Sequence, residues 1–378
     1  MKLVIKVGTS TITDKDGSLN KQYVSALAQT VAQFQKENNE ILIVSSGAIG
    51  AGIGHLNLKS KPKTLREKQA LAAVGQPLIM NAYAEAFLSH GLSVAQVLLT
   101  RDDFEDRVKY INARNTLCEL IDRKIIPIIN ENDTVAVEEI NFGDNDTLAA
   151  LAACAVDADF LVILTDVDGL YDGIPSKSKL INKVEKITPE IENYATCKSS
   201  SGKGTGGMAT KISAAKIATA SGVNVVITNG SKLELLKNIS SGEATGLATG
   251  LASGFASGFA CGTFFEADKR SLEAKKSWIA FGKKPKGNIF VDKRAAQALT
   301  EGGKSLLAAG IVKVSGNFKR GDTVFISEAE SNKDFARGLI NFDSQEMQKI
   351  KGKKSKEIQK IIAAAEEEVI HRNNLVII

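Results

Sequence analysis

The sequence has few of the residues that build disulfide frameworks and transition-metal sites. Its 378 residues include four cysteines, which are far apart and form no CxxC pair, and three equally scattered histidines. This pattern favours a reducing compartment and argues against a zinc site. No apolar run is long enough for a membrane span, and the run after Met1 is too short for a signal peptide. We therefore expect a cytoplasmic protein with no membrane partner and no metal held by protein ligands alone.

The composition that is present is ordinary for a globular protein, but the charge is unevenly distributed. Hydrophobic residues make up 43% of the chain and charged residues 24%. The net charge is +5, yet residues 271–378 hold 20 Lys and Arg against 13 Asp and Glu, and residues 1–270 hold 28 against 30. A length of 378 residues predicts two or three domains. A near-neutral body followed by a basic tail indicates two modules with different partners.

Apolar strand-like runs alternate with helical segments through most of the chain. The predicted strands cover residues 2–7, 40–45, 92–99, 125–129, 159–164 and 224–228. The predicted helices cover residues 20–36, 65–89, 101–123, 147–156, 208–220 and 232–238. This alternation predicts an α/β fold, specifically a three-layer α/β/α sandwich with a mostly parallel central sheet. In such sheets ligands bind beyond the carboxyl ends of the strands.

The most polar strand end lies in the stretch from Pro127 to Leu151. The apolar run stops abruptly at Asn130-Glu-Asn-Asp133, and Gly143-Asp-Asn-Asp146 then precedes an Ala/Leu-rich helix. Charged and amide groups at such a point are costly to bury unless a ligand or partner satisfies them. An N-capping loop with aspartates at turn positions is the alternative. Two such clusters around one loop favour a binding site.

The sequence contains three glycine-rich turns, and the first two follow predicted strands directly. They are Lys6-Val-Gly-Thr-Ser10, the run from Ser46 to Gly54, and the run from Ser199 to Lys211 that leads into a helix. Backbone N–H groups at glycine turns and helix starts bind anions, and lysines neutralise phosphate. An edge lysine at position 6 and a flexible loop at 199–211 are the alternatives. Neither a GxGxxG dinucleotide fingerprint nor a Walker motif fits these turns.

This set of loops favours phosphoryl transfer, in which positioning and charge neutralisation do most of the work. No general base is obvious in the sequence. A carboxylate acceptor needs none, because its unperturbed pKa of about 4.3 leaves it ionised at neutral pH. A hydroxyl acceptor would more often need a positioned base. The residues therefore predict phosphoryl transfer and leave the acceptor open.

The segment Ala244–Thr263 repeats a four-residue unit of Ala, Thr or Ser, Gly, and Leu or Phe, which becomes Ala-Cys-Gly-Thr in the last copy. Glycine in every unit disfavours a helix, and a period of four drifts around one. We expect a surface connector, with a packing element or an oligomer contact as the alternative. It would divide the chain into a module at 1–243, the connector at 244–263, the end of that module with a linker helix at 264–281, and a β-rich domain at 282–378.

These motifs resemble those of the glutamate 5-kinases in the amino acid kinase family, and the resemblance covers nearly the whole chain. The β-rich domain resembles a PUA domain through residues 306–316 and 318–326. Its expected strands are 288–291, 311–314, 323–327 and 335–339, with a helix near 294–299. The resemblance implies ATP-dependent phosphorylation of the side-chain carboxylate of L-glutamate, the first step of proline synthesis.

The resemblance also implies a role for each site residue. The implied catalytic residues are Lys6, Lys211 and Asp146. The implied substrate-binding residues are Ser46, Gly47, Asp133, Asp144 and Asn145. The implied ATP-binding residues are Lys6, Thr165, Asp166, Thr205, Gly206, Gly207, Met208, Ala209, Thr210 and Lys211. Mg²⁺ would arrive with ATP, chelated mainly by phosphate oxygens, and no protein residue is expected to be a metal ligand.

The expected partners are L-glutamate and ATP, with proline as feedback inhibitor and a second copy of the chain in a homo-oligomer. Two alternatives stay open: a sibling kinase acting on N-acetylglutamate or another small acid, and an RNA-binding protein on a kinase scaffold. The basic tail makes RNA a conceivable partner. Its dispersed charges and few aromatic residues argue against that reading.

Overall fold

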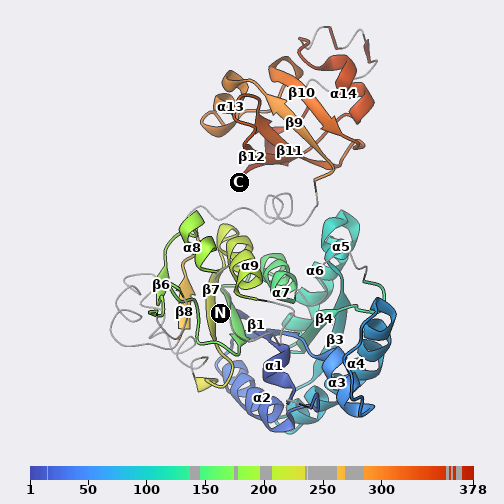
Figure 1. Cartoon of the computed structure of the whole chain (residues 1–378), viewed down its shortest axis with the longest axis vertical. Helices are drawn as coiled ribbons and strands as arrows, with labels where there is room; N and C mark the ends of the chain where they lie inside the picture. The colour runs from blue at the N-terminus through green and yellow to red at the C-terminus, as the bar shows by residue number, and fades with distance from the viewer. Residues whose placement is uncertain are drawn as a thin grey trace. The chain divides into compact units, whose positions relative to one another are not determined.

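The structure, a computed structural model, describes residues 1–14, 16–136, 145–173, 178–195, 207–234, 236, 262–268, 285–354, 357–358, 361–362 and 368–378. These residues form two compact units, one within residues 1–103 and 107–268 and one that contains the described residues of 285–378 (Figure 1). Each unit has its own hydrophobic core. In the described parts of the chain, no helix is both long and apolar enough to cross a membrane.

The larger unit is built on an eight-stranded sheet with the order β3-β4-β2-β1-β5-β7-β8-β6. The strands are β1 (Lys2–Val7), β2 (Glu40–Ser45), β3 (Val94–Leu99), β4 (Ile126–Glu131), β5 (Phe160–Thr165), β6 (Lys183–Val184), β7 (Asn224–Asn229) and β8 (Gly262–Phe265). Every neighbouring pair runs parallel except β7 with β8. The predicted mostly parallel sheet is therefore confirmed.

Helices cover both faces of this sheet (Figure 1). One face carries α2 (Lys21–Lys36), α3 (Ala48–His55) and α4 (Leu65–Leu88), and the other carries α6 (Arg107–Asp122), α7 (Asn145–Ala155) and α9 (Met208–Ala220). Three shorter helices are α1 (Thr9–Ile12), α5 (Arg101–Glu105) and α8 (Pro189–Tyr194). This arrangement is the predicted three-layer α/β/α sandwich.

The central strands β1 and β5 are buried on both faces. All six residues of β5 are buried, as are five of the six in β1. The sequences of such strands are continuous apolar runs because helices cover them on both sides. Lys6 interrupts the run in β1 and is 6% exposed. Its ammonium group must find a partner inside the protein, because an unpaired buried charge is very costly. The alternative of an edge lysine that reaches water is excluded.

The sequence suggested a glycine-rich turn leading into a helix after Ser46, and in the structure most of the run to Gly54 is already helical. Gly47 caps the helix with φ of 99°, and α3 begins at Ala48. A Cβ on Gly75 of α4 would lie 1.8 Å from the Ala48 carbonyl oxygen, and one on Gly52 would lie 2.2 Å from that of Leu71. Glycines therefore let α3 and α4 approach backbone to backbone. Close packing, rather than phosphate binding, explains much of this glycine content.

Three further sequence predictions need correction. The helix expected over residues 101–123 is two helices, α5 and α6, separated at Asp106. The break falls in the charged run Glu105-Asp106-Arg107, which offers no apolar side chain to continue the packed face. Gly262 and Thr263, expected in the connector, belong to β8 and pair with β7. The elements β6, α8 and β8 were not predicted.

Several expected segments lie outside the described residues. They are the rest of the connector at 244–261, the linker helix expected within 269–281, and residues 235, 237 and 238 of the helix expected at 232–238, of which Glu234 and Leu236 are helical.

The smaller unit is a five-stranded sheet with the order β10-β9-β11-β12-β13. Its strands are β9 (Gly287–Val291), β10 (Ile311–Gly316), β11 (Thr323–Glu328), β12 (Asp334–Leu339) and β13 (Leu375–Ile377). Its helices are α13 (Lys293–Thr300) and α14 (Ser344–Ile350), with 3-10 turns η3 (Ala308–Gly310) and η4 (Arg372–Asn374). Only β9 and β11 pair in parallel within this sheet. The β-rich prediction is confirmed, although β13 and α14 were missed.

Candidate active site

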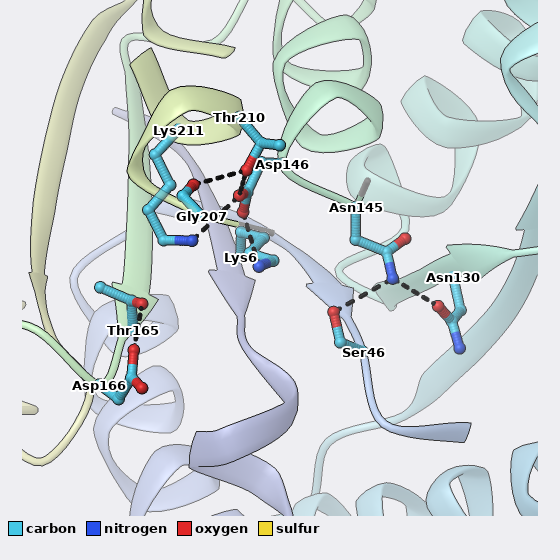
Figure 2. Close-up of polar contacts among 10 residues, drawn as sticks. All are labelled: Lys6, Ser46, Asn130, Asn145, Asp146, Thr165, Asp166, Gly207, Thr210 and Lys211. Atoms are coloured by element: carbon cyan, nitrogen blue, oxygen red, sulfur yellow. Dashed lines mark hydrogen bonds and ion pairs between the residues drawn. The ribbon is translucent and has the colours of Figure 1, made fainter. Parts of the chain in front are cut away.

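The predicted polar residues gather at the carboxyl ends of the central strands (Figure 2). Lys6 lies near the end of β1, Ser46 follows β2, and Thr165 ends β5. The starts of α7 and α9 bring Asn145, Asp146 and the segment Gly207–Lys211 to the same edge. Ligands bind at this edge in open parallel sheets because strand ends and helix starts leave backbone groups and loop side chains accessible there.

The first feature of the site is a lysine–aspartate cluster made of Lys6, Asp146 and Lys211. The Lys6 ammonium lies 2.6 Å from Asp146 Oδ1, and the Lys211 ammonium lies 3.1 Å from Asp146 Oδ2. The three residues are only 6%, 1% and 5% exposed. Two cations are thus fixed at one point by a single buried carboxylate. Such an arrangement can neutralise phosphate oxygens without first having to reorganise.

The charge state of Asp146 follows from its neighbours. Burial alone would raise the pKa of this carboxyl, but the charges of Lys6 and Lys211 outweigh burial and lower the pKa to about 2. Thr210 Oγ1 adds a hydrogen bond to Asp146 Oδ2 at 2.8 Å. Asp146 is therefore ionised throughout the physiological range. It orients the lysines and does not donate a proton.

Lys211 occupies an unusual place for a cation. It lies in the first turn of α9, which Gly207 caps and which Met208 and Ala209 begin. A positive charge at a helix N-terminus is unfavourable because it faces the positive end of the helix dipole. Asp146 offsets this cost in the ligand-free protein. A bound phosphate would interact favourably with both the lysine and the helix start.

The second feature is an amide cluster made of Ser46, Asn130 and Asn145, all of which are buried. Asn145 Nδ2 donates to Ser46 Oγ at 3.1 Å and to Asn130 Oδ1 at 3.0 Å (Figure 2). Asn145 Oδ1 is buried and has no hydrogen-bond partner among the described residues. A buried acceptor left unsatisfied costs about 1–3 kcal/mol. The oxygen is therefore suited to a donor group on a ligand.

Two residues that were not among the predicted site residues continue this cluster. Asn130 Nδ2 donates to Gln76 Oε1 at 2.7 Å, and Gln76 Nε2 donates to Gln96 Oε1 at 3.2 Å. A signal was present, because Gln76 stands in an otherwise apolar stretch of its helix and Gln96 in an apolar strand. A polar residue at such a position needs a specific partner.

Asp133 lies two residues beyond the end of β4, in a turn. Burial raises the pKa of its carboxyl, and the negative charge of Glu131 raises it further, to about 7. Within the part of the chain that the structure describes, no cation forms an ion pair or hydrogen bond with Asp133. A cationic ligand group placed here would relieve the repulsion between the two carboxylates.

Thr165 and Asp166 lie apart from both clusters, at the end of β5 (Figure 2). Thr165 Oγ1 donates to Asp166 Oδ1 at 3.1 Å, and its carbonyl accepts from Gly230 N at 2.7 Å. The loop after β5 is joined to the turn after β7 by an ion pair of 2.9 Å between Lys232 and Asp168. Three predicted site residues, Asp144, Thr205 and Gly206, lie outside the described residues.

No protein-built metal site is found within the described residues, in which three or more His, Cys, Asp or Glu side chains never cluster as ligands. The donor set around the two lysines is cationic and does not suit a divalent ion bound directly by the protein. A divalent ion would fit this site only as part of a complex with a phosphate ligand.

Comparison with known proteins agrees with this geometry. The profile of the amino acid kinase family matches residues 1–229, and that of the PUA domain matches residues 287–362. Glutamate 5-kinase from Thermoanaerobacter sp. (strain X514) is 47% identical over 382 residues, which cover 100% of this chain and 98% of that protein. Those from Caldanaerobacter subterraneus and Microcystis aeruginosa are 46% and 43% identical, cover 100% of this chain, and are themselves covered to 98% and 96%. The chain belongs to the amino acid kinase family and carries a C-terminal PUA domain.

Proposed function

We propose that this chain transfers the γ-phosphoryl group of ATP to the side-chain carboxylate of L-glutamate, the first step of proline biosynthesis. The observation that carries the proposal is the pair of clusters at the start of α7. Asp146 holds two lysines that would act on the phosphoryl group, and the preceding residue, Asn145, has a buried oxygen with no hydrogen-bond partner among the described residues. Identities of 43–47% to glutamate 5-kinases support glutamate as the acceptor.

The reaction requires that two anions approach each other. A carboxylate oxygen of glutamate attacks the γ-phosphorus and forms a new O–P bond, while the bond from that phosphorus to the β,γ-bridging oxygen breaks and ADP leaves with the electron pair. No proton has to move, because a carboxylate is already ionised at neutral pH. Lys6 and Lys211 would neutralise the phosphoryl oxygens, and Asp146 would keep both ammonium groups in place. Mg²⁺ bound to the nucleotide would add further neutralisation.

Recognition of the acceptor falls to groups on the other side of the site. The Asp133 carboxylate and Asn145 Oδ1 both suit the α-ammonium of glutamate, one by charge and one as a hydrogen-bond acceptor. Ser46 Oγ accepts from Asn145, which leaves the hydroxyl proton for a substrate oxygen. N-Acetylglutamate has no ammonium group, so it would meet the Asp133 charge with a neutral amide.

The nucleotide would be bound by the residues predicted from the sequence. Thr165, Asp166 and the segment from Thr205 to Lys211 would contact ATP, and the start of α9 supports phosphate binding. We place the reaction in the cytoplasm. A homo-oligomer and inhibition by proline stay predictions. Mutual exclusion of proline and glutamate in binding titrations would test the second.

The direct test is to trap the acyl phosphate. Purified protein with MgATP, L-glutamate and hydroxylamine should form γ-glutamyl hydroxamate, and parallel reactions with N-acetylglutamate, aspartate and carbamate should give far less product. Preference for N-acetylglutamate would favour the sibling kinase reading. Absence of phosphorylation with any acid, combined with sequence-selective RNA binding at physiological salt, would favour the RNA-binding alternative.

A further inference from the structure

Four side-chain amides form a continuous hydrogen-bonded row from the candidate active site to the protein surface. The row runs from Asn145 at the start of α7 through Asn130 on β4 and Gln76 on α4 to Gln96 on the edge strand β3. We call these four residues the amide row. The first three are buried and Gln96 is exposed, so the row ends at solvent. Four separate elements of the fold meet in it.

The amide row has a fixed direction. The Glu131 backbone N–H donates to Asn130 Oδ1 at 2.9 Å. A backbone N–H can only donate, so it forces the oxygen of the Asn130 amide, and not its nitrogen, to face that side. Asn145 must then present its NH₂ group to the same oxygen. The Asn130 NH₂ group must in turn find an acceptor in Gln76, and the Gln76 NH₂ group one in Gln96.

This direction determines what the active site offers to a ligand. Because the Asn145 NH₂ group is committed to Asn130 and Ser46, its oxygen is turned away from both. That oxygen is buried, with no donor among the described residues. With the amide rotated by half a turn, the same position would hold an NH₂ group and would suit an acceptor. One backbone N–H thus decides whether Asn145 offers an acceptor or a donor at this position.

We propose that Gln76 and Gln96 are specificity-determining positioning residues, which hold Asn130 and Asn145 so that the site selects acids carrying a hydrogen-bond donor next to the carboxylate chain. The identity of that donor as the α-ammonium of glutamate rests on the proposed function. Gln76 gives the buried Asn130 NH₂ group its acceptor, and Gln96 does the same for Gln76. Neither glutamine touches the substrate.

The test compares the full-length chain with its Gln76→Met variant, which removes the acceptor while keeping side-chain length. Dissociation constants are measured for glutamate, 2-hydroxyglutarate and glutarate, which carry an ammonium, a hydroxyl and no donor at that carbon. The preference for glutamate over glutarate should fall roughly tenfold, as expected for losing one oriented hydrogen bond to a charged group. Gln76→Glu keeps the acceptor and should retain most of the preference.

Gln35→Met is the matched control. Gln35 lies near the C-terminal end of α2, outside the amide row, and its side chain donates to the Lys124 carbonyl. This variant should leave all three constants unchanged. A purely structural role for Gln76 would weaken the three acids equally. An unchanged ratio of glutamate to glutarate, or an equal loss for all three, overturns the proposal.

A measurement without ligand separates this proposal from the proposed function. In protein labelled with ¹⁵N at asparagine and glutamine, the Asn130 side-chain NH₂ protons should exchange slowly, and Gln76→Met should expose them to fast exchange. Fast exchange in the unsubstituted chain overturns the amide row even if glutamate is phosphorylated. Slow exchange in a protein that does not phosphorylate glutamate would refute the proposed substrate and leave the row intact.

Discussion

Asn145 and Asp146 are consecutive residues, yet each organises a different half of the candidate site. Asp146 holds two lysines by charge, at 2.6 and 3.1 Å. Asn145 is held by neutral groups, at 3.0 and 3.1 Å, and keeps one oxygen open. The ion pairs of the charged half are strong enough to stabilise a transferring phosphoryl group. The hydrogen bonds of the neutral half are directional, so they can discriminate between ligands. On the proposed roles, rate and selectivity would therefore depend on different side chains.

The position of α7 makes this division possible. Successive residues of a helix point about 100° apart, so neighbours at a helix start can face different groups. All eleven residues of α7 are buried, so packing on every side fixes the position and orientation of the helix. The backbone thus places an amide and a carboxylate side by side. Substitutions that act on one half should leave the other half measurable, and the following predictions use this separation.

The largest effect is expected from Lys211→Met, which removes one cation from the charged half. The turnover number should fall by about 10² to 10³, the usual cost of one electrostatic contact to a transition state. The KM for glutamate should change little. Lys216→Met on the same helix, which removes an exposed pairing with Glu192, is the matched control. Near-normal turnover in folded Lys211→Met would show that the lysine does not act on the phosphoryl group.

A smaller effect is expected from Asn145→Leu, which removes the open acceptor from the neutral half. The KM for glutamate should rise roughly ten- to hundredfold, since a hydrogen bond to a charged ligand group is lost. The KM for ATP should stay close to its original value. Steady-state kinetics with each substrate varied in turn gives both constants. A rise confined to the ATP constant would contradict the assignment of the two halves.

A milder effect should come from pH through Asp133. Its pKa is raised to about 7 in the ligand-free protein, so protonation below that value removes the charge that would bind an ammonium group. Glutamate affinity should therefore rise with pH, by about tenfold per unit below pH 7, and level off above it. Asp133→Asn should flatten this profile. Profiles of kcat/KM for glutamate from pH 5.5 to about 8.5 would check it; the same slope in Asp133→Asn would assign the titration to another group.

The smallest effect is expected from ending the chain at Asp268, which removes the PUA domain. Asp268 N still donates to the Thr219 carbonyl, and β8 still pairs with β7, so the larger unit keeps all its described strands. Turnover should stay within about threefold, as expected for a domain with its own core. A chain ending at residue 261 lacks β8 and should be less stable. A folded but inactive chain ending at Asp268 would show that the PUA domain is needed for the reaction.

The sequence predicted the charged half better than the neutral half, and the reason is physical. Lys6 interrupts a buried apolar run, and Asp146 and Lys211 lie at helix starts beside glycine or acidic residues. Each is costly where it stands, so each indicates a partner without any knowledge of the fold. The α/β alternation likewise predicted the layers and the sheet edge where these residues meet.

The amide row could not be predicted in the same way. A neutral glutamine such as Gln76 carries no large penalty until its burial is known, and its partners lie on other elements. The start of α3 at Ala48, within the glycine-rich run, was missed for a related reason. Glycine content fits both a turn and a close helix contact, and only the position of α4 decides between them. Strand β8 was hidden because its first residues continue a repeat.

The contact at Gly75 has a consequence for how this site can change over evolutionary time. Gly75 directly precedes Gln76, and there the main chain of α4 abuts the main chain of α3 at Ala48. No side chain separates the two helices at this contact. Substitutions elsewhere in the core should therefore change the distance between α3 and α4 very little. The position of the side chain at residue 76 is therefore set by contacts between backbone atoms. During evolution the identity of the side chain at position 76 can change far more easily than its location in the fold.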